Sequence, residues 1–122
     1  MDRETLDYVA ERADILSTAG SSMQSTKDAA LAWKEAVAAD PSDEAVEAAT
    51  QTLVDYLDGR PRKIDALIEF CEGPGKEVFG EEAAAASAER HRKRREEGAK
   101  FCDCPSCTAA TEILAKFGRV EL

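Results

Sequence analysis

Apolar residues recur at intervals of three and four along most of the chain, which is the spacing that places side chains on one face of an α-helix. No stretch alternates polar and apolar residues over the length of a strand. The sequence therefore predicts an all-α fold, a small bundle of five to six helices. The predicted helices span residues 3–18, 26–39, 43–58, 60–72, 81–97 and 105–117.

Local signals mark the ends of several predicted helices. Asp2 is placed to cap the first helix, and Ser25 with Asp28 three positions later has the form of a capping box for the second. The Gly-Pro-Gly run at 73–75 breaks the chain, and only a short turn is expected over residues 76–80. Trp33 is the only tryptophan and is expected to anchor a core rather than to serve as a stacking platform.

The length and the charge distribution restrict the domain organisation and the class of partner. A chain of 122 residues fits one domain, so residues 1–122 are predicted to form a single helical domain. Residues 1–59 contain 13 acidic and 4 basic residues, whereas residues 60–122 contain 12 of each. The acidic first part argues against general nucleic-acid binding, and the asymmetry suggests that the cysteine-containing second part meets the partner.

The distribution of apolar residues also predicts a location. No window approaches 18 consecutive apolar residues, so no membrane-spanning segment is expected. The first six residues are largely polar and charged, without the apolar run of a signal peptide, which favours a cytoplasmic protein. In a reducing compartment, clustered cysteines act as metal ligands or redox thiols more often than as structural disulfides.

The densest chemistry lies near the C-terminus, where Cys102, Cys104 and Cys107 form the pattern C-x-C-x-x-C. Three thiolates at this spacing can face a single point if the chain curls between Phe101 and Pro105. Proline fits the first turn of a helix because it has no N–H to satisfy. Cys107 would then lie in that first turn, where the helix dipole favours a thiolate. The sequence therefore predicts a metal site at the C-terminal cysteines.

Three kinds of site fit the cysteine pattern. A structural zinc ion is favoured, since zinc takes sulfur and nitrogen ligands and Cys104-Pro105-Ser106-Cys107 has the Cys-Pro-x-Cys form of zinc knuckles. A 4Fe-4S cluster held by the same cysteines is the first alternative. The second is a dithiol, because the tetrapeptide Cys104 to Cys107 resembles the active-site tetrapeptide of glutaredoxin-like proteins. The alternative functions are therefore an iron–sulfur electron carrier or a dithiol redox protein.

A zinc site of this kind needs a fourth ligand, and the sequence offers Cys71 and His91. Cys71 follows Ile64, Leu67 and Ile68 on the apolar face of its predicted helix, which suits a buried site with four sulfur ligands. His91 is nearer to the cluster along the chain, but the basic residues around it disfavour a bound dication. Cys71 is therefore the preferred fourth ligand, and His91 is the alternative.

A run of basic residues surrounds His91 near the end of the fifth predicted helix. Six consecutive residues cover every face of a helix, so this end is expected to project into solvent or to meet an acidic surface of a protein partner. Pairing with the acidic residues 1–59 is the alternative. No phosphate-binding loop or catalytic pair is present, and these features together favour a non-enzymatic adaptor or accessory subunit. The predicted partner-binding residues are Arg90, Arg92, Lys93, Arg94 and Arg95.

Overall fold

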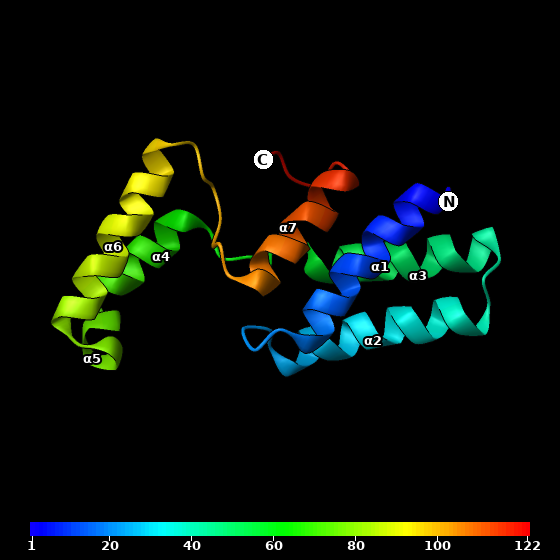
Figure 1. Ribbon diagram of the computed structural model, residues 1–122, viewed down its shortest axis with the longest axis horizontal. Helices are drawn as coiled ribbons and strands as arrows, with labels where there is room; N and C mark the ends of the chain where they lie inside the picture. The colour runs from blue at the N-terminus through cyan, green and yellow to red at the C-terminus, as the bar shows by residue number, and fades with distance from the viewer. The chain divides into compact units, whose positions relative to one another are not determined.

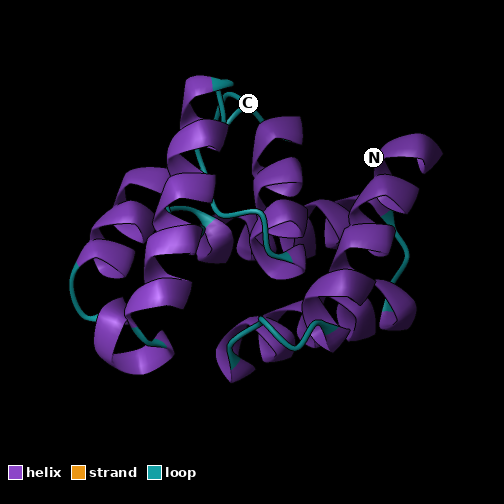
Figure 2. Ribbon diagram, turned by 60° about the vertical axis from the view of Figure 1, so that its left-hand side comes forward, coloured by secondary structure: helices purple, strands orange, loops and turns teal.

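The computed structural model describes residues 1–122, and it consists of helices and loops without a strand (Figures 1 and 2). The all-α prediction is confirmed, but there are seven helices instead of five or six. The only β-type pairing is an isolated antiparallel bridge between Lys63 and Phe101. The helices are α1 (Arg3–Thr18), α2 (Gln24–Ala39), α3 (Asp43–Leu57), α4 (Ile64–Glu72), α5 (Gly75–Phe79), α6 (Glu81–Glu96) and α7 (Pro105–Lys116).

The additional helix is α5, which forms where only a short turn was expected. It begins at Gly75, and a Cβ atom at that position would lie 2.8 Å from the carbonyl oxygen of Phe70. Glycine therefore permits a close approach of α5 to the end of α4. The aromatic rings of Phe70 and Phe79 then meet edge to face, with their centroids 6.1 Å apart.

Two predicted helix starts are wrong, and tertiary contacts explain both. α4 begins at Ile64 rather than at residue 60, because the backbone at Arg62 and Ile64 pairs with residues 100–102 instead of forming a first helical turn. α2 begins at Gln24 after Met23, with no side-chain cap. Ser25 does not cap it, and its hydroxyl accepts a hydrogen bond of 2.7 Å from the hydroxyl of Tyr56. The cap of α1 is confirmed, since Asp2 accepts from the Thr5 N–H at 3.3 Å.

The chain forms two compact units, and the boundary differs from the division into an acidic and a cysteine-containing part. The first unit comprises Met1–Pro61 with Asp103–Glu121 and holds α1, α2, α3 and α7. The second unit comprises Arg62–Cys102 and holds α4, α5 and α6. The last helix therefore packs with the acidic part of the chain, and the single domain over residues 1–122 stays a prediction.

The first unit has a well-defined apolar core. α1 packs against α2 and α7, and α3 packs against the same two helices. Trp33 is 4% exposed, and its indole Nε1 donates a 2.9 Å hydrogen bond to Thr50 Oγ1, so its predicted role as a core anchor is confirmed. The buried core residues are Val9, Ala13, Leu16, Ala30, Trp33, Leu53, Val54, Leu57, Ala109, Ala110, Ile113 and Leu114.

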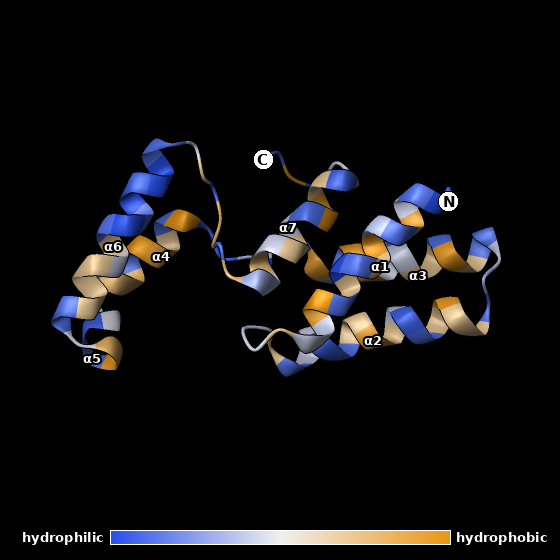
Figure 3. Ribbon diagram, in the orientation of Figure 1, coloured by the Kyte–Doolittle hydropathy of each residue, from blue (hydrophilic) through white to orange (hydrophobic).

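The second unit has a smaller core. α6 packs against α4 and α5, and its buried alanines allow close packing. Figure 3 shows that α6 has a weakly apolar stretch after its acidic first turn and is strongly hydrophilic from there to its C-terminal end. The buried residues of the second unit are Ile64, Ile68, Cys71, Gly75, Ala84, Ala88 and His91. The second unit therefore buries few apolar side chains that could stabilise the segment after α6, up to Cys102.

None of the helices in the structure is both long enough and apolar enough to cross a membrane.

Candidate metal centre

The ligand atoms of Cys102, Cys104 and Cys107 all lie within 4.8 Å of one another. None of the four cysteines of the chain forms a disulfide, so these three are present as thiols. Around a tetrahedral zinc ion with Zn–S bonds of about 2.3 Å, two sulfurs lie about 3.8 Å apart. A contraction of about 1 Å or less would therefore bring the three sulfurs to the spacing of a shared metal ion. The predicted cysteine cluster is confirmed as a group that could bind a metal.

The backbone on the N-terminal side of the cluster is fixed by hydrogen bonds. The N–H of Cys102 donates to the carbonyl of Arg62 at 2.8 Å, and the N–H of Ile64 donates to the carbonyl of Lys100 at 2.9 Å. These bonds flank the bridge between Lys63 and Phe101. Cys102 is therefore held at the N-terminal end of α4.

Cys104 is the N-cap residue of α7, and the cap is made by its sulfur. Its Sγ accepts a hydrogen bond of 3.3 Å from the N–H of Cys107, and its carbonyl accepts from Thr108 at 2.9 Å. Pro105 occupies the first helical position, as predicted. A sulfur in this position lies at the positive end of the helix dipole, which favours the thiolate that a metal requires.

The loop between α1 and α2 supports the first turn of α7. Ser21 Oγ accepts from the N–H of Ser106 at 3.3 Å, and Ser22 Oγ donates to Ser106 Oγ at 2.8 Å. Ser21 and Ser22 lie between the first two predicted helices, where the sequence pattern assigned them no partner. Serines that follow a helix-ending glycine are frequent backbone hydrogen-bond partners, but their partner lies more than 80 residues away and could not be read from the pattern.

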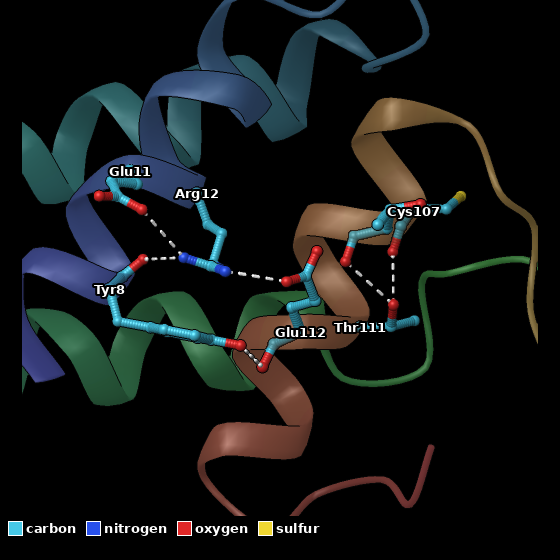
Figure 4. A network of polar contacts seen from close by, with 7 residues as sticks. Tyr8, Glu11, Arg12, Cys107, Thr111 and Glu112 are labelled. Atoms are coloured by element: carbon cyan, nitrogen blue, oxygen red, sulfur yellow. Dashed lines mark hydrogen bonds and ion pairs between the residues drawn. The ribbon is translucent and has the colours of Figure 1, made fainter.

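An ion pair fixes α7 against α1 (Figure 4). The guanidinium of Arg12 donates to Glu112 Oε2 at 2.9 Å and lies 3.4 Å from the ring centroid of Tyr8. Burial is the largest single influence on Arg12 and lowers its pKa, but the hydrogen bond to Glu112 together with the charge interactions with Tyr8, Glu112 and Glu11 raises the pKa above its ordinary value. Further along the same helix, Thr111 Oγ1 donates to the carbonyl of Cys107 at 2.9 Å. Figure 4 shows the Cys107 sulfur pointing away from the ion pair.

The two candidate fourth ligands are both buried in the second unit. Cys71 is 6% exposed, and its predicted place on the buried face of α4 with Ile64 and Ile68 is confirmed. His91 is also 6% exposed, which differs from the expectation that the basic end of this helix has no buried face. The three-cysteine group contains neither residue. The identity of the fourth ligand therefore stays a prediction.

The basic residues around His91 make contacts within the second unit. Arg92 forms an ion pair with Glu72, and Arg95 pairs with Asp65 at 2.7 Å. Both acidic partners belong to α4. They are therefore not the acidic residues 1–59, which the sequence suggested for the basic run as an alternative to a partner protein. The two arginine side chains are 45% and 48% exposed, and ion pairs at such exposure contribute about 1 kcal/mol or less.

Arg94 has a role that the sequence reasoning did not find. Its guanidinium lies 3.0 Å from Nδ1 of His91 through one nitrogen, and through the other it donates to the carbonyl of Phe101 at 3.0 Å. Arg94 follows His91 by three positions, so the two side chains are neighbours on the helix surface. The three-residue spacing could have indicated the contact with His91. The contact with the carbonyl of Phe101 depends on the path of the chain after α6 and could not be read from the sequence.

Comparison of the chain with protein-family models, with curated proteins and with solved structures finds no match. The residues themselves therefore carry the functional argument.

Proposed function

We propose that this protein is a small cytoplasmic metal-binding protein in which Cys102, Cys104 and Cys107 bind one structural zinc ion. The observation that carries the proposal is the convergence of three thiols within 4.8 Å. Zinc sites of structural type use cysteine thiolates in closed, tetrahedral arrangements and contribute directly to folding. The reducing environment of the cytoplasm would keep the cysteines available as ligands.

The spacing of the sulfurs favours a single ion over an iron–sulfur cluster. In a 4Fe-4S cluster each cysteine binds a different iron, so the ligand sulfurs surround a cage and lie farther apart than around one metal ion. The sulfurs in this protein lie within 4.8 Å of one another, which is nearer to the spacing around one ion than to the spacing around a cage. The cluster therefore supports zinc as the cofactor, with 4Fe-4S as the alternative.

The second candidate function is dithiol redox chemistry, and the cap of α7 is the observation that favours it. Cys104 presents its sulfur at a helix N-terminus and accepts from the N–H of Cys107, the other cysteine of the tetrapeptide. A thiolate stabilised in this way is a nucleophile for thiol–disulfide exchange. The Cys104 thiolate would attack a substrate disulfide, break its S–S bond and release one substrate thiol. Cys107 would then displace the second substrate thiol, which leaves a disulfide between Cys104 and Cys107 and the substrate reduced by two electrons.

Elemental analysis of protein purified anaerobically distinguishes the three possibilities. We expect a colourless protein with one zinc per chain and three thiols, those of Cys102, Cys104 and Cys107, that titrate only after the metal is removed. The Cys102→Ser variant should lose most of the zinc. A brown protein that absorbs at about 400 nm would contradict the proposal in favour of an iron–sulfur cluster. A metal-free protein with a reversible disulfide between Cys104 and Cys107 would favour the dithiol.

We also propose that the protein acts as an adaptor or accessory subunit that docks an acidic protein surface through the basic end of α6. Arg92 and Lys93 are the residues to test, because both side chains are exposed and the exposed pair of Arg92 with Glu72 contributes little, whereas Arg94 contacts His91 and the carbonyl of Phe101. The double variant Arg92→Glu/Lys93→Glu should weaken binding of a polyglutamate peptide about tenfold or more at low ionic strength. The wild-type interaction should fade as the salt concentration rises.

A matched control separates a local surface from overall charge. The variant Lys27→Glu/Lys76→Glu changes the net charge by the same amount at sites on α2 and α5. It should leave peptide binding nearly unchanged. Equal weakening by the two double variants would show that the peptide responds to net charge alone, and the docking surface would be rejected.

A further inference from the structure

We propose that an exposed apolar patch on the second unit binds a basic amphipathic helix of a protein partner. The patch consists of Phe70 near the end of α4 and of Val78 and Phe79 on α5. It lies wholly within residues 62–102, so its geometry belongs to one unit. The proposal is independent of the zinc ion and of the docking surface at the basic end of α6.

Exposed apolar side chains gather in this part of the chain. Seven large apolar residues of the protein are exposed, and three of them fall between residues 70 and 79. Phe70 is 38% exposed, Val78 is 65% exposed and Phe79 is 60% exposed. Gly75 is the buried residue of α5, so the large apolar side chains of this helix lie on the surface and not in the core (Figure 3). A single exposed apolar residue needs no explanation, but a cluster of them is typical of an interaction site.

The two aromatic rings of the patch are held in place within the unit. The rings of Phe70 and Phe79 meet edge to face, with their centroids 6.1 Å apart. Gly75 lies against Phe70, since a Cβ atom at this position would lie 3.2 Å from two carbons of that ring. The Phe70 ring therefore contacts both the backbone of α5 and the ring of Phe79, which restricts its motion. Side chains that are already fixed lose little conformational entropy on binding, and aromatic residues contribute strongly to interfaces.

Negative charge surrounds the apolar patch. Residues 69–82 contain five exposed glutamates and one lysine. Glu72 forms an ion pair with Arg92 of α6. Glu69 lies in the last turn of α4, where the helix dipole disfavours a negative charge, so it does not serve the stability of its own helix. A partner that covers the patch must therefore bring positive charge. The glutamates are Glu69, Glu72, Glu77, Glu81 and Glu82.

A basic amphipathic helix combines the two properties that the patch requires. Apolar side chains on one face of such a helix would cover the aromatic rings, and lysines or arginines beside them would pair with the surrounding glutamates. A second copy of this chain fits less well, because a two-fold contact through the patch would bring two sets of glutamates together. A membrane surface that contains anionic lipids would repel the glutamates in the same way.

Calorimetric titration of the full-length protein with a synthetic peptide tests the proposal. The probe is a peptide of about 15 leucines and lysines whose leucines lie on one face of a helix. A peptide of the same composition in scrambled order is the control for charge. We expect the protein to bind the amphipathic peptide about tenfold more tightly than the scrambled peptide, because only the first presents a continuous apolar face.

Substitution of the patch tests its apolar side chains. The double variant Val78→Ser/Phe79→Ser should weaken binding of the amphipathic peptide about tenfold or more. The matched control Ile15→Ser/Met23→Ser removes two apolar side chains of the first unit that are 42% and 65% exposed. The control should leave binding nearly unchanged, and circular dichroism checks that both variants keep their helices.

A second pair of variants tests the charge around the patch. Glu77→Gln/Glu82→Gln should weaken binding about threefold or more at low ionic strength, and the difference should fade as the salt concentration rises. Glu35→Gln/Glu44→Gln neutralises the same number of exposed glutamates on α2 and α3. The effect of this control should be smaller. Equal weakening by the two pairs would show that net charge alone attracts the peptide, and the proposal would be rejected.

Three further results would overturn the proposal. Equal peptide affinity of wild type and Val78→Ser/Phe79→Ser would show that the apolar side chains take no part in binding. A wild-type dimer that this variant converts to a monomer, measured by sedimentation equilibrium, would show that a second copy covers the patch. Binding of phosphatidylcholine vesicles that the variant loses, without binding of the amphipathic peptide, would assign the patch to a membrane surface.

Discussion

Removing the zinc ion should accelerate amide hydrogen exchange around the cysteine cluster about a thousandfold, while the core of the first unit remains protected. The affected amides should be those of Ile64, Cys102 and Cys107. Free zinc at a thousand times its dissociation constant stabilises the folded form by about 4 kcal/mol, which corresponds to this change in exchange rate. The expectation rests on the proposed zinc site.

The packing of the two units explains why the effect should be local. The backbone bonds of residues 100–102 belong to the second unit, whose apolar core is small, so the metal would contribute much of the stability there. α7 instead buries Ala109, Ala110, Ile113 and Leu114 in the core of the first unit. Those contacts do not require a metal. α7 should therefore keep its protection after its first turn.

Hydrogen exchange measured by mass spectrometry or NMR, with and without a zinc chelator, checks this prediction. The variant Cys104→Ser in the presence of zinc should reproduce the effect of the chelator at Ile64 and Cys102. The amides of Leu53 and Leu114 serve as the internal reference. Exchange that is unchanged at Ile64 and Cys102 after complete removal of zinc would show that the metal has no structural role.

Replacing Leu114 with alanine should lower the free energy of unfolding of the first unit by about 3 kcal/mol. Leu114 is fully buried on α7 in the core that also contains Val9 and Leu53. Truncating a buried leucine removes its transfer free energy and leaves a cavity, at a cost of about 2 to 5 kcal/mol. Because small domains are stable by only about 5–15 kcal/mol, this substitution should remove a large part of the total.

Urea denaturation followed by tryptophan fluorescence measures this loss, because Trp33, the only tryptophan, lies in the same core. The matched control is Leu31→Ala on α2, where the side chain is 44% exposed. The control should cost less than about 1 kcal/mol, since it forms no buried cavity. Equal midpoints for the two variants would mean that α7 is not part of the cooperative core that Trp33 reports.

The sequence alone determined the features that depend on neighbouring residues. The bounds of α1 and the cap at Asp2 were predicted correctly, because a helical stripe and its N-cap involve residues within a few positions of one another. The convergence of Cys102, Cys104 and Cys107 was predictable for the same reason. Their spacing and Pro105 fix the path of a six-residue segment, so few conformations remain that would separate the sulfurs.

Only the tertiary structure decided the features that depend on residues distant in the chain. The start of α4 moved because residues 62–64 pair with residues 100–102, and the expected cap at Ser25 was lost to a bond with Tyr56. α7 joined the acidic helices because its apolar face is buried against α1 and α3. Local pattern does not specify which of several apolar faces a helix will meet. His91 shows the same limit, since its burial follows from the packing of the alanine face of α6 and not from the charged residues beside it.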